Sequence, residues 1–192
     1  MIGIIGQGFV GNAVYQKFKN HFGVDTFDID PSISNATYDK VIQNKIIFIC
    51  LPTPMNPDGS CNTSIVEGEI EKLNKLGKYT IVVKSTIIPG TTKAWNKKYN
   101  SDIVFNPEFL TEKNAVKDFE NQKHIVLGGP DNATKKIKKV FELVFEKAKI
   151  SCVEETTAEL LKYYLNCFLA VKVSFANEMY GISDKLGVSY DS

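Results

Sequence analysis

The stretch that most constrains this chain is its first eleven residues, MIGIIGQGFVG. Met1–Ile5 is an apolar run with the length of a buried strand, and it is followed by Gly6, Gly8 and Gly11 in the order G-x-G-x-x-G. From Ala13 onward, apolar residues recur at roughly helical spacing. We therefore predict a strand, a tight turn built on glycines, and a helix.

Each glycine has a physical role in such a turn. The first permits the sharp turn, the second lets the backbone approach a pyrophosphate, and the third lets the helix pack closely against the strand. The N-terminus of the helix adds free N–H groups and a partial positive charge. The geometry suits a dinucleotide, whose predicted site includes Phe9 and Val10 beside the glycines. Glycines also end strands for structural reasons alone, so the triplet by itself leaves both interpretations open.

A second strand, predicted over Val24–Asp30, carries two candidate acids for the ribose of a dinucleotide. Asp28 lies 22 positions after Gly6, close to the ~20-residue spacing at which a carboxylate accepts hydrogen bonds from a ribose 2′-hydroxyl. Asp30 is the alternative, and both acids could simply end the strand before Pro31. All 23 basic residues are lysines. Because a 2′-phosphate usually needs an arginine at this point, NAD is favoured over NADP.

Composition narrows the class of protein. The 192 residues suffice for one substantial domain and an extra element, and the net charge of +1 indicates neither a nucleic-acid-binding nor a membrane-binding surface. The four cysteines show no C-x-x-C spacing, so we expect no metal site and no disulfide framework. Because Met1 begins the first strand and no apolar run reaches ~20 residues, we expect a cytoplasmic protein without a signal peptide or a membrane span.

Strands and helices alternate along the chain, which predicts an α/β fold with a doubly wound parallel sheet. Further strands are expected at Lys45–Leu51, Tyr79–Lys84, Asp102–Phe105, His124–Leu127 and Ile150–Val153, and helices at Thr37–Gln43, Thr63–Leu76, Thr91–Tyr99, around Ile137–Val144 and at Thr156–Leu186. We place a Rossmann-like domain at residues 1–155 and a long interdomain helix at residues 156–192.

Polar residues follow three of the predicted strands. Thr53 stands between two prolines, Thr86 follows a strand and a serine, and Glu108 follows a strand and Pro107. The carboxyl ends of parallel strands meet at one edge of the sheet, where ligands bind in open α/β folds. We therefore expect these three side chains near one another.

The long helix carries two polar residues, Lys162 and Asn166, which project from one side because they are four residues apart. On spacing alone, a solvated stripe is the simpler interpretation. The neighbouring Tyr164, Leu165 and Phe168 predict instead that the helix is packed on more than one side.

Five segments together resemble one family. They are GQGFVG, LPTP, KSTIIPGTT, NPEFLTE and AELLKYYLNCFLAVKVSFANE, and they resemble the N-terminal half of the nucleotide-sugar 6-dehydrogenases, the UDP-glucose and UDP-N-acetylmannosamine dehydrogenase group. The resemblance implies oxidation of the C6 hydroxyl of a UDP-sugar to a carboxylate in two NAD-dependent steps, through a thiohemiacetal and a thioester on a cysteine.

The resemblance also implies roles for particular residues. Gly6, Gly8, Gly11 and Asp28 hold NAD with help from Thr53 and Thr86, of which Thr86 also belongs to the catalytic set. Glu108 positions or activates the water that hydrolyses the thioester, and Lys162 and Asn166 stabilise negative charge on the reacting oxygen. The sugar site is lined by Glu108, Phe109, Leu110, Thr111, Glu112, Lys162 and Asn166, with Glu112 also near the nicotinamide.

Two departures of the sequence from the family bear on catalysis. The nucleophilic cysteine of the family lies in a G-G-x-C-x-P-K-D segment beyond the central helix, and none of the four cysteines here has that setting. We also expect no counterpart within these 192 residues of the second Rossmann-like domain, which binds the UDP in the family. We therefore expect an incomplete catalyst, which is a fragment, a truncated gene product or one piece of a split enzyme.

Several alternatives stay open at this point. The partners implied are a UDP-sugar and either a second copy bound through the central helix or a second chain that supplies the cysteine. A non-catalytic NAD-binding or assembly protein is one alternative function. A relative of the β-hydroxyacid dehydrogenases is another, since these also place an asparagine four residues after a lysine on a long helix.

Overall fold

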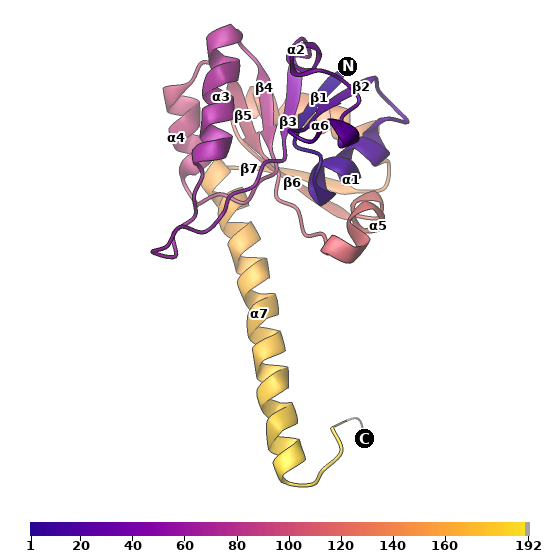
Figure 1. The fold of residues 1–192 in the computed structure, drawn as a ribbon, viewed down its shortest axis with the longest axis vertical. Coiled ribbons are helices and arrows are strands. Elements are labelled where there is room, and N and C mark those ends of the chain that lie inside the picture. Colours follow the sequence, from indigo (N-terminus) through magenta and orange to yellow (C-terminus); the bar gives the residue numbers. More distant parts are fainter. Residues whose placement is uncertain (191–192) are drawn as a thin grey trace.

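The computed structural model describes residues 1–190, which form a seven-stranded sheet with helices on both faces and one long helix that leaves it (Figure 1). The strands are β1 (Ile2–Ile5), β2 (Val24–Phe27), β3 (Ile46–Ile49), β4 (Thr80–Val83), β5 (Asp102–Phe105), β6 (His124–Gly128) and β7 (Lys149–Val153). The α-helices are α1 (Phe9–Phe18), α2 (Tyr38–Val41), α3 (Ser64–Leu76), α4 (Thr91–Lys98), α5 (Ala115–Glu120), α6 (Asp131–Glu142) and α7 (Glu155–Lys185), and two short 3₁₀ helices are η1 (Pro31–Ile33) and η2 (Glu112–Asn114).

The sheet is doubly wound, as the sequence predicts. Its strand order is β2-β1-β3-β4-β5-β6-β7, and β1 to β5 are parallel. Successive residues of β3 point to opposite faces: Phe48 packs into one core, while Ile47 and Ile49 pack into the other. The sequences of such strands are continuous apolar runs because helices cover both faces of the sheet.

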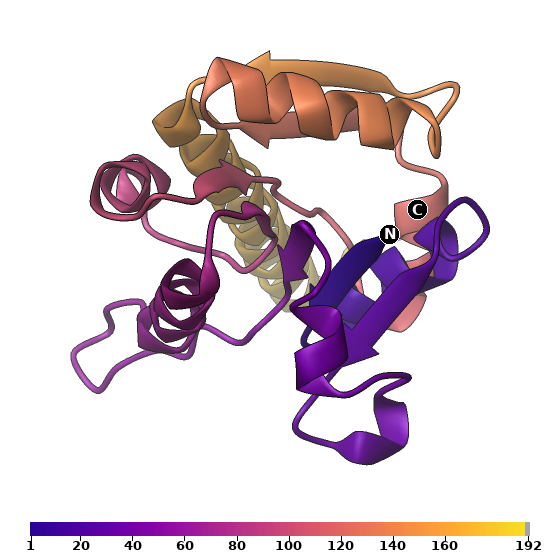
Figure 2. The same ribbon diagram turned by 90° about the horizontal axis from the view of Figure 1, so that it is seen from above.

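Two hydrophobic cores therefore lie on the two faces. One contains an aromatic cluster in which the Phe18 ring contacts the rings of Phe48, Phe119 and Phe141. The other core is built by α3 and α4, with Trp95 of α4 3% exposed. Figure 2 shows the helices on both sides of the strands.

The sheet is not parallel throughout, which corrects the predicted arrangement. β6 runs antiparallel to β5, and the two strands pair only at Phe105 and Gly128, whereas β6 and β7 are parallel. A parallel neighbour needs a crossover that covers one face of the sheet. The connection from β5 instead forms α5, which packs against α1 on the same face as the Phe18 cluster. The chain then enters β6 from the opposite direction.

Several predicted boundaries also shift. The second strand ends at Phe27 rather than Asp30, because the Asp30 carboxylate accepts a hydrogen bond from the backbone N–H of Ser32 and opens η1. The sequence did not predict α5, which is too short to show a helical pattern: its buried residues are Ala115 and Phe119.

The long helix α7 is 31 residues in length, and its far part extends away from the sheet (Figure 1). Its buried residues, Ala158, Glu159 and Lys162, all lie in the first third. A methyl group on Gly128 of β6 would collide with the side chain of Ala158, so this glycine allows the helix to approach the sheet. Within residues 1–190 no helix has the length and apolar character needed to cross a membrane.

Within this single chain, α7 beyond Lys162 is not packed on more than one side. The Tyr164 side chain is 67% exposed and the Phe168 side chain 54%. In residues 1–190 the apolar residues beyond Lys162 lie where the helix has left the sheet.

Candidate functional site

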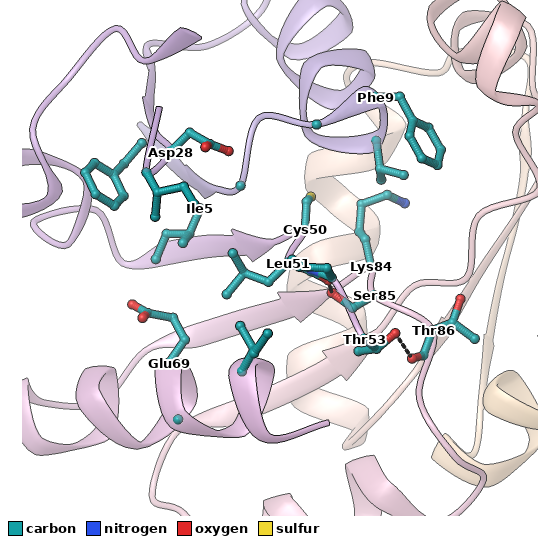
Figure 3. Close-up of a pocket in the computed structure, with 18 of the residues that line it drawn as sticks. Ile5, Phe9, Asp28, Cys50, Leu51, Thr53, Glu69, Lys84, Ser85 and Thr86 are labelled. Atoms are coloured by element: carbon teal, nitrogen blue, oxygen red, sulfur yellow. Dashed lines mark hydrogen bonds between the residues drawn. The ribbon is translucent and has the colours of Figure 1, made fainter. Parts of the chain in front are cut away.

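A cavity of about 1100 Å³ lies along the carboxyl ends of β1, β2, β3 and β4 (Figure 3). From β1 the chain winds outward to β2 in one direction and to β3 in the other. In doubly wound sheets, ligands bind in the crevice at such a point. Asp28 and Glu69 lie at one end of the cavity in Figure 3, and Lys84 and Thr86 lie at the other.

The glycine turn has the geometry that the sequence pattern requires. Gly6 has φ of 94°, a conformation that L-amino acids with side chains rarely adopt. A Cβ on Gly11 would collide with the carbonyl oxygen of Gly6, whereas a Cβ on Gly8 would meet nothing within 4 Å. The turn is therefore tight at its two ends and open to the cavity at its centre. Gly6, Gly8, Phe9 and Val10 line the cavity.

The N-terminus of α1 points at this opening. Gly8 caps the helix without a side chain, and the first turn contains no acidic residue. Unpaired N–H groups and the helix dipole at such an end favour an anion. The open face at Gly8 thus suits the approach of a phosphate.

The structure separates the two candidate acids of the ribose site. Asp28 lines the cavity, and its Oδ2 accepts a hydrogen bond from the backbone N–H of Gln7 at 2.6 Å. Asp30 lies outside the residues that line the cavity, and its Oδ1 accepts hydrogen bonds from the N–H and hydroxyl of Ser32. Geometry therefore favours Asp28 as the group that faces a bound ribose.

The loops after β3 and β4 are tied together. The hydroxyl of Thr53 donates to the carbonyl oxygen of Thr86 at 2.8 Å (Figure 3), and the hydroxyl of Ser85 donates to the carbonyl oxygen of Leu51 at 2.6 Å. Thr53, Ser85 and Thr86 all line the cavity. Thr53 and Thr86, two of the predicted site residues, are therefore neighbours. The Thr53 hydroxyl contacts the backbone carbonyl of Thr86 rather than its hydroxyl.

Lys84 is a buried cation that the sequence analysis did not single out. It lines the cavity, is 3% exposed, and its Nζ donates to Oδ1 of Asn106 at 2.8 Å. Burial lowers the pKa of Lys84 to about 8. The side chain of Asn106 in turn donates to the carbonyl oxygen of Val126. This network joins β4 and β6 to the segment that carries Glu108.

Glu108 and Lys162 meet at the same edge. Lys162 Nζ lies 2.8 Å from Glu108 Oε1 and also donates to the Glu108 carbonyl oxygen. The side chains of Lys162 and Glu108 are 6% and 11% exposed. The Phe109 ring lies beneath the ammonium, with 5.4 Å between Nζ and the ring centroid. A lysine from the long helix and a glutamate from the strand-end loop thus form one largely buried pair.

The other predicted substrate residues are placed differently. Leu110 packs against a hydrophobic core, and Thr111 donates both its N–H and its hydroxyl to Asp118. Glu112 lies in η2 and lines a separate cavity of about 320 Å³ together with Phe9. Asn166 is exposed, one turn of α7 beyond Lys162.

Glu159 anchors α7 and was also missed by the sequence analysis. It is fully buried, and its carboxylate accepts hydrogen bonds from the backbone N–H groups of Gly90 and Thr92 at the N-terminus of α4. Burial raises the pKa of this carboxyl group. Glu159 precedes Lys162 by three residues, which puts both on one face of α7. This spacing is the sequence pattern that could have pointed to Glu159.

The four cysteines are free in the structure. Cys50 lines the cavity, and burial raises the pKa of its thiol to about 12, so it carries no thiolate at neutral pH. Cys61 lies beside the Thr86 loop, where its Sγ is 3.7 Å from the carbonyl oxygen of Thr86. Cys152 and Cys167 are exposed.

Comparisons with known proteins identify the family of the chain. Residues 32–149 match the model of the UDP-glucose/GDP-mannose dehydrogenase family, NAD binding domain, and residues 156–192 match the model of the central domain of the same family. The chain belongs to the UDP-glucose/GDP-mannose dehydrogenase family. The resemblance noted from the sequence is confirmed, and NAD is the cofactor of the family domain that the chain carries. The glycine turn and Asp28 precede the matched residues.

Individual relatives are similar over part of their length. The UDP-glucose 6-dehydrogenase AglM of Haloferax volcanii is 33% identical, and the match covers 97% of this chain and 55% of that protein. A UDP-glucose dehydrogenase structure from Pyrobaculum islandicum has a TM-score of 0.86 at 29% identity, covering 97% of this chain and 54% of that one. A ternary complex of GDP-mannose dehydrogenase from Pseudomonas aeruginosa, at 24% identity and a TM-score of 0.82, shares the fold over 98% of this chain and 54% of its own. The chain thus spans about half the length of these relatives.

Proposed function

We propose that this chain is the NAD-binding portion of a nucleotide-sugar dehydrogenase that oxidises the C6 hydroxyl of a UDP-sugar to a carboxylate. The observation that carries the proposal is the largely buried ion pair of Glu108 and Lys162, because Glu108 lines the same cavity as the glycine turn and Asp28. Burying two charged groups costs free energy, so a paired lysine and glutamate beside a cavity support a catalytic role for this pair.

The cavity fits the cofactor. Gly8 offers an open approach for the pyrophosphate, and the α1 N-terminus faces it. In the proposal, Asp28 accepts hydrogen bonds from a ribose, and Thr53 and Thr86 border the nicotinamide end. Bound NAD⁺ supplies the hydride acceptor. The absence of arginine and the carboxylate of Asp28 favour NAD over NADP.

Lys162 and Glu108 then act on the sugar. Lys162, held by Glu108, places an ammonium where the C6 oxygen loses its proton, and such preorganised charge typically contributes about 3–4 kcal/mol to transition-state stabilisation. Asn166, one turn further along α7, adds an amide donor. Glu108 holds the water that cleaves the thioester and accepts its proton. Each molecule of sugar gives two hydrides to two NAD⁺ and gains one oxygen atom from water.

The nucleophilic cysteine of this scheme comes from outside residues 1–192. It belongs either to a longer form of the chain or to a second polypeptide. UDP-glucose and UDP-N-acetylmannosamine are the two substrate candidates, and the names of the relatives support the first.

A second copy of the chain is the proposed partner of α7. Beyond Lys162 the helix exposes large apolar side chains, among them Val171 at 63% and Phe175 at 66%. Apolar patches of this kind mark interaction surfaces. Sedimentation equilibrium tests the proposal: a dimer that Phe175→Lys converts to a monomer supports it, and a natural chain that is monomeric at tens of micromolar contradicts it.

Complementation tests the enzymatic function. The chain is mixed with the C-terminal half of the Haloferax volcanii relative, and NADH formation is followed at 340 nm with each UDP-sugar. We expect turnover that Lys162→Ala abolishes while NAD⁺ binding, measured by calorimetry, is retained. Equal turnover by Lys162→Ala would refute the role of Lys162, and NAD⁺ binding without turnover by any mixture would favour a non-catalytic module.

A further inference from the structure

Helix α3 presents an unfilled position to the cavity at Gly68. This glycine lies inside the helix and lines the cavity, and a Cβ built on it meets nothing within 4 Å. A glycine inside a helix is destabilising relative to alanine, and no neighbouring atom of this chain requires one here. The space above Gly68 is therefore available to a ligand that packs against the helix backbone.

The next residue, Glu69, is a buried carboxylate at the same place. It is 6% exposed and lines the cavity, and Figure 3 shows its carboxylate extending from α3 toward Ile5. Oε1 accepts a hydrogen bond from the hydroxyl of Tyr38, and Oε2 lies 3.1 Å from Nζ of Lys72. A carboxylate has about four lone-pair sites, so these two donors leave it able to accept further hydrogen bonds.

The surroundings suit a flat, partly apolar group. Ile29 and Ile65 both line the cavity and are 95% and 44% exposed. Tyr38 stands behind Glu69, with its ring edge-on to Phe27 at 5.3 Å between centroids. Burial and the neighbouring Glu69 carboxylate raise the pKa of Tyr38, so its hydroxyl stays a donor to Glu69. The carboxylate thus remains an acceptor toward the cavity.

In a dinucleotide held by Asp28, the base attached to that ribose lies at this end of the cavity. Adenine carries an exocyclic N6 amino group, which is a hydrogen-bond donor, and a carboxylate is an acceptor only. Hypoxanthine has the same ring size but presents an O6 acceptor at that position. An acidic group facing this position therefore distinguishes the two bases.

We propose that Gly68 and Glu69 form an adenine-specific subsite, in which the base packs over Gly68 and its N6 amino group donates to the Glu69 carboxylate. The inference rests on the proposed function, because it requires NAD in this cavity. It adds a determinant of base specificity to the ribose contact of Asp28.

The first test compares two dinucleotides on the unmodified chain. NAD⁺ and nicotinamide hypoxanthine dinucleotide are titrated by calorimetry under identical conditions. A hydrogen bond to a charged group contributes enough to binding that we expect the hypoxanthine analogue to bind at least about tenfold more weakly. Equal affinities would overturn the subsite while leaving NAD binding intact. Failure of both dinucleotides to bind would overturn the proposed function and the subsite with it.

The second test changes the acceptor. Glu69→Gln keeps the length of the side chain and places an amide where the carboxylate stood, and this amide can donate to O6 of hypoxanthine. We expect the preference for NAD⁺ over the analogue to shrink to less than about threefold or to reverse. Because the readout is a ratio measured on one variant, a general loss of stability cancels. An unchanged ratio would contradict the assignment of Glu69.

The third test fills the space at Gly68. Gly68→Ala should raise the thermal midpoint, because alanine favours the helix, and should weaken NAD⁺ binding, because the added methyl group occupies the volume of the base. Gly181→Ala is the matched control: Gly181 lies inside α7, and its Cβ also meets nothing within 4 Å. This control should raise the midpoint and leave NAD⁺ affinity unchanged. NAD⁺ affinity retained by Gly68→Ala would overturn the packing of the base over Gly68.

Discussion

Lys84 gives the sharpest prediction about stability, because a buried cation opposes folding. It is 3% exposed, and burial lowers its pKa from the usual 10.5 to about 8. The substitution Lys84→Met keeps most of the side-chain volume and removes the charge. We predict that the variant is at least as stable as the natural chain at pH 7, although the substitution lies in the centre of the fold.

The magnitude follows from the pKa. The difference between 10.5 and about 8 is about 2.5, and at 1.36 kcal/mol for each pKa unit the charged form disfavours folding by about 3 kcal/mol. Lys84→Met also leaves Oδ1 of Asn106 without its donor, which costs about 1–3 kcal/mol. The two effects leave the variant about 0–2 kcal/mol more stable at pH 7.

The free energy of unfolding of the natural chain should change with pH in a definite direction. Below pH 8 the lysine is protonated in both the folded and the unfolded chain. Between pH 8 and 10.5 the folded chain has released the proton and the unfolded chain still holds it, so unfolding takes up a proton and the stability of the natural chain rises with pH. The advantage of Lys84→Met should therefore fall by about 3 kcal/mol over this interval.

Urea unfolding of both proteins at pH 7, 8, 9 and 10 measures this difference. Other titrating groups are common to the two proteins and cancel. Lys139→Met, at an exposed position of α6, is the matched control and should show no comparable change with pH. A difference between Lys84→Met and the natural chain that stays constant from pH 7 to 10 would refute the reasoning.

Two further predictions concern the turn and the helix anchor. Gly11→Ala places a methyl group against the carbonyl oxygen of Gly6 and should abolish the cooperative unfolding transition, so a well-folded Gly11→Ala would contradict the close packing. Gly8→Ala should fold normally by circular dichroism but lose NAD⁺ affinity in calorimetry. Glu159→Ala leaves the N–H groups of Gly90 and Thr92 without their acceptor. It should lower the free energy of unfolding by about 2–4 kcal/mol in urea titrations. A loss below about 0.5 kcal/mol would count against Glu159 as the anchor of α7.

Local sequence patterns predicted the backbone geometry of the glycine turn and of the strand end beside it. The tight turn at Gly6, the close packing at Gly11 and the position of Asp28 at a strand end all depend on residues near one another in sequence. The apolar runs likewise predicted every strand of the sheet. Such features follow from backbone geometry and burial within a single strand–turn–helix unit.

Contacts between distant elements were not predictable in the same way. Glu159 and Lys84 look like ordinary charged residues in the sequence, and only the docking of α7 and the end of β4 buries them. The direction of β6 depends on where the chain after Phe105 finds a surface to pack on, which α1 provides. The apolar residues of α7 indicate that the helix is packed, but they do not specify which surface they contact, and within this chain the part beyond Lys162 is exposed.

Calorimetric titration of the chain with NAD⁺ tests the central claim most directly, with Asp28→Ala and Asp30→Ala measured beside it. We predict saturable binding of one NAD⁺ per chain, at least about tenfold weaker in Asp28→Ala, because hydrogen bonds to a charged carboxylate are lost. Asp30→Ala should bind as the natural chain does, since Asp30 lies outside the residues that line the cavity. No binding at millimolar NAD⁺, or equal binding by the natural chain and Asp28→Ala, would contradict the account.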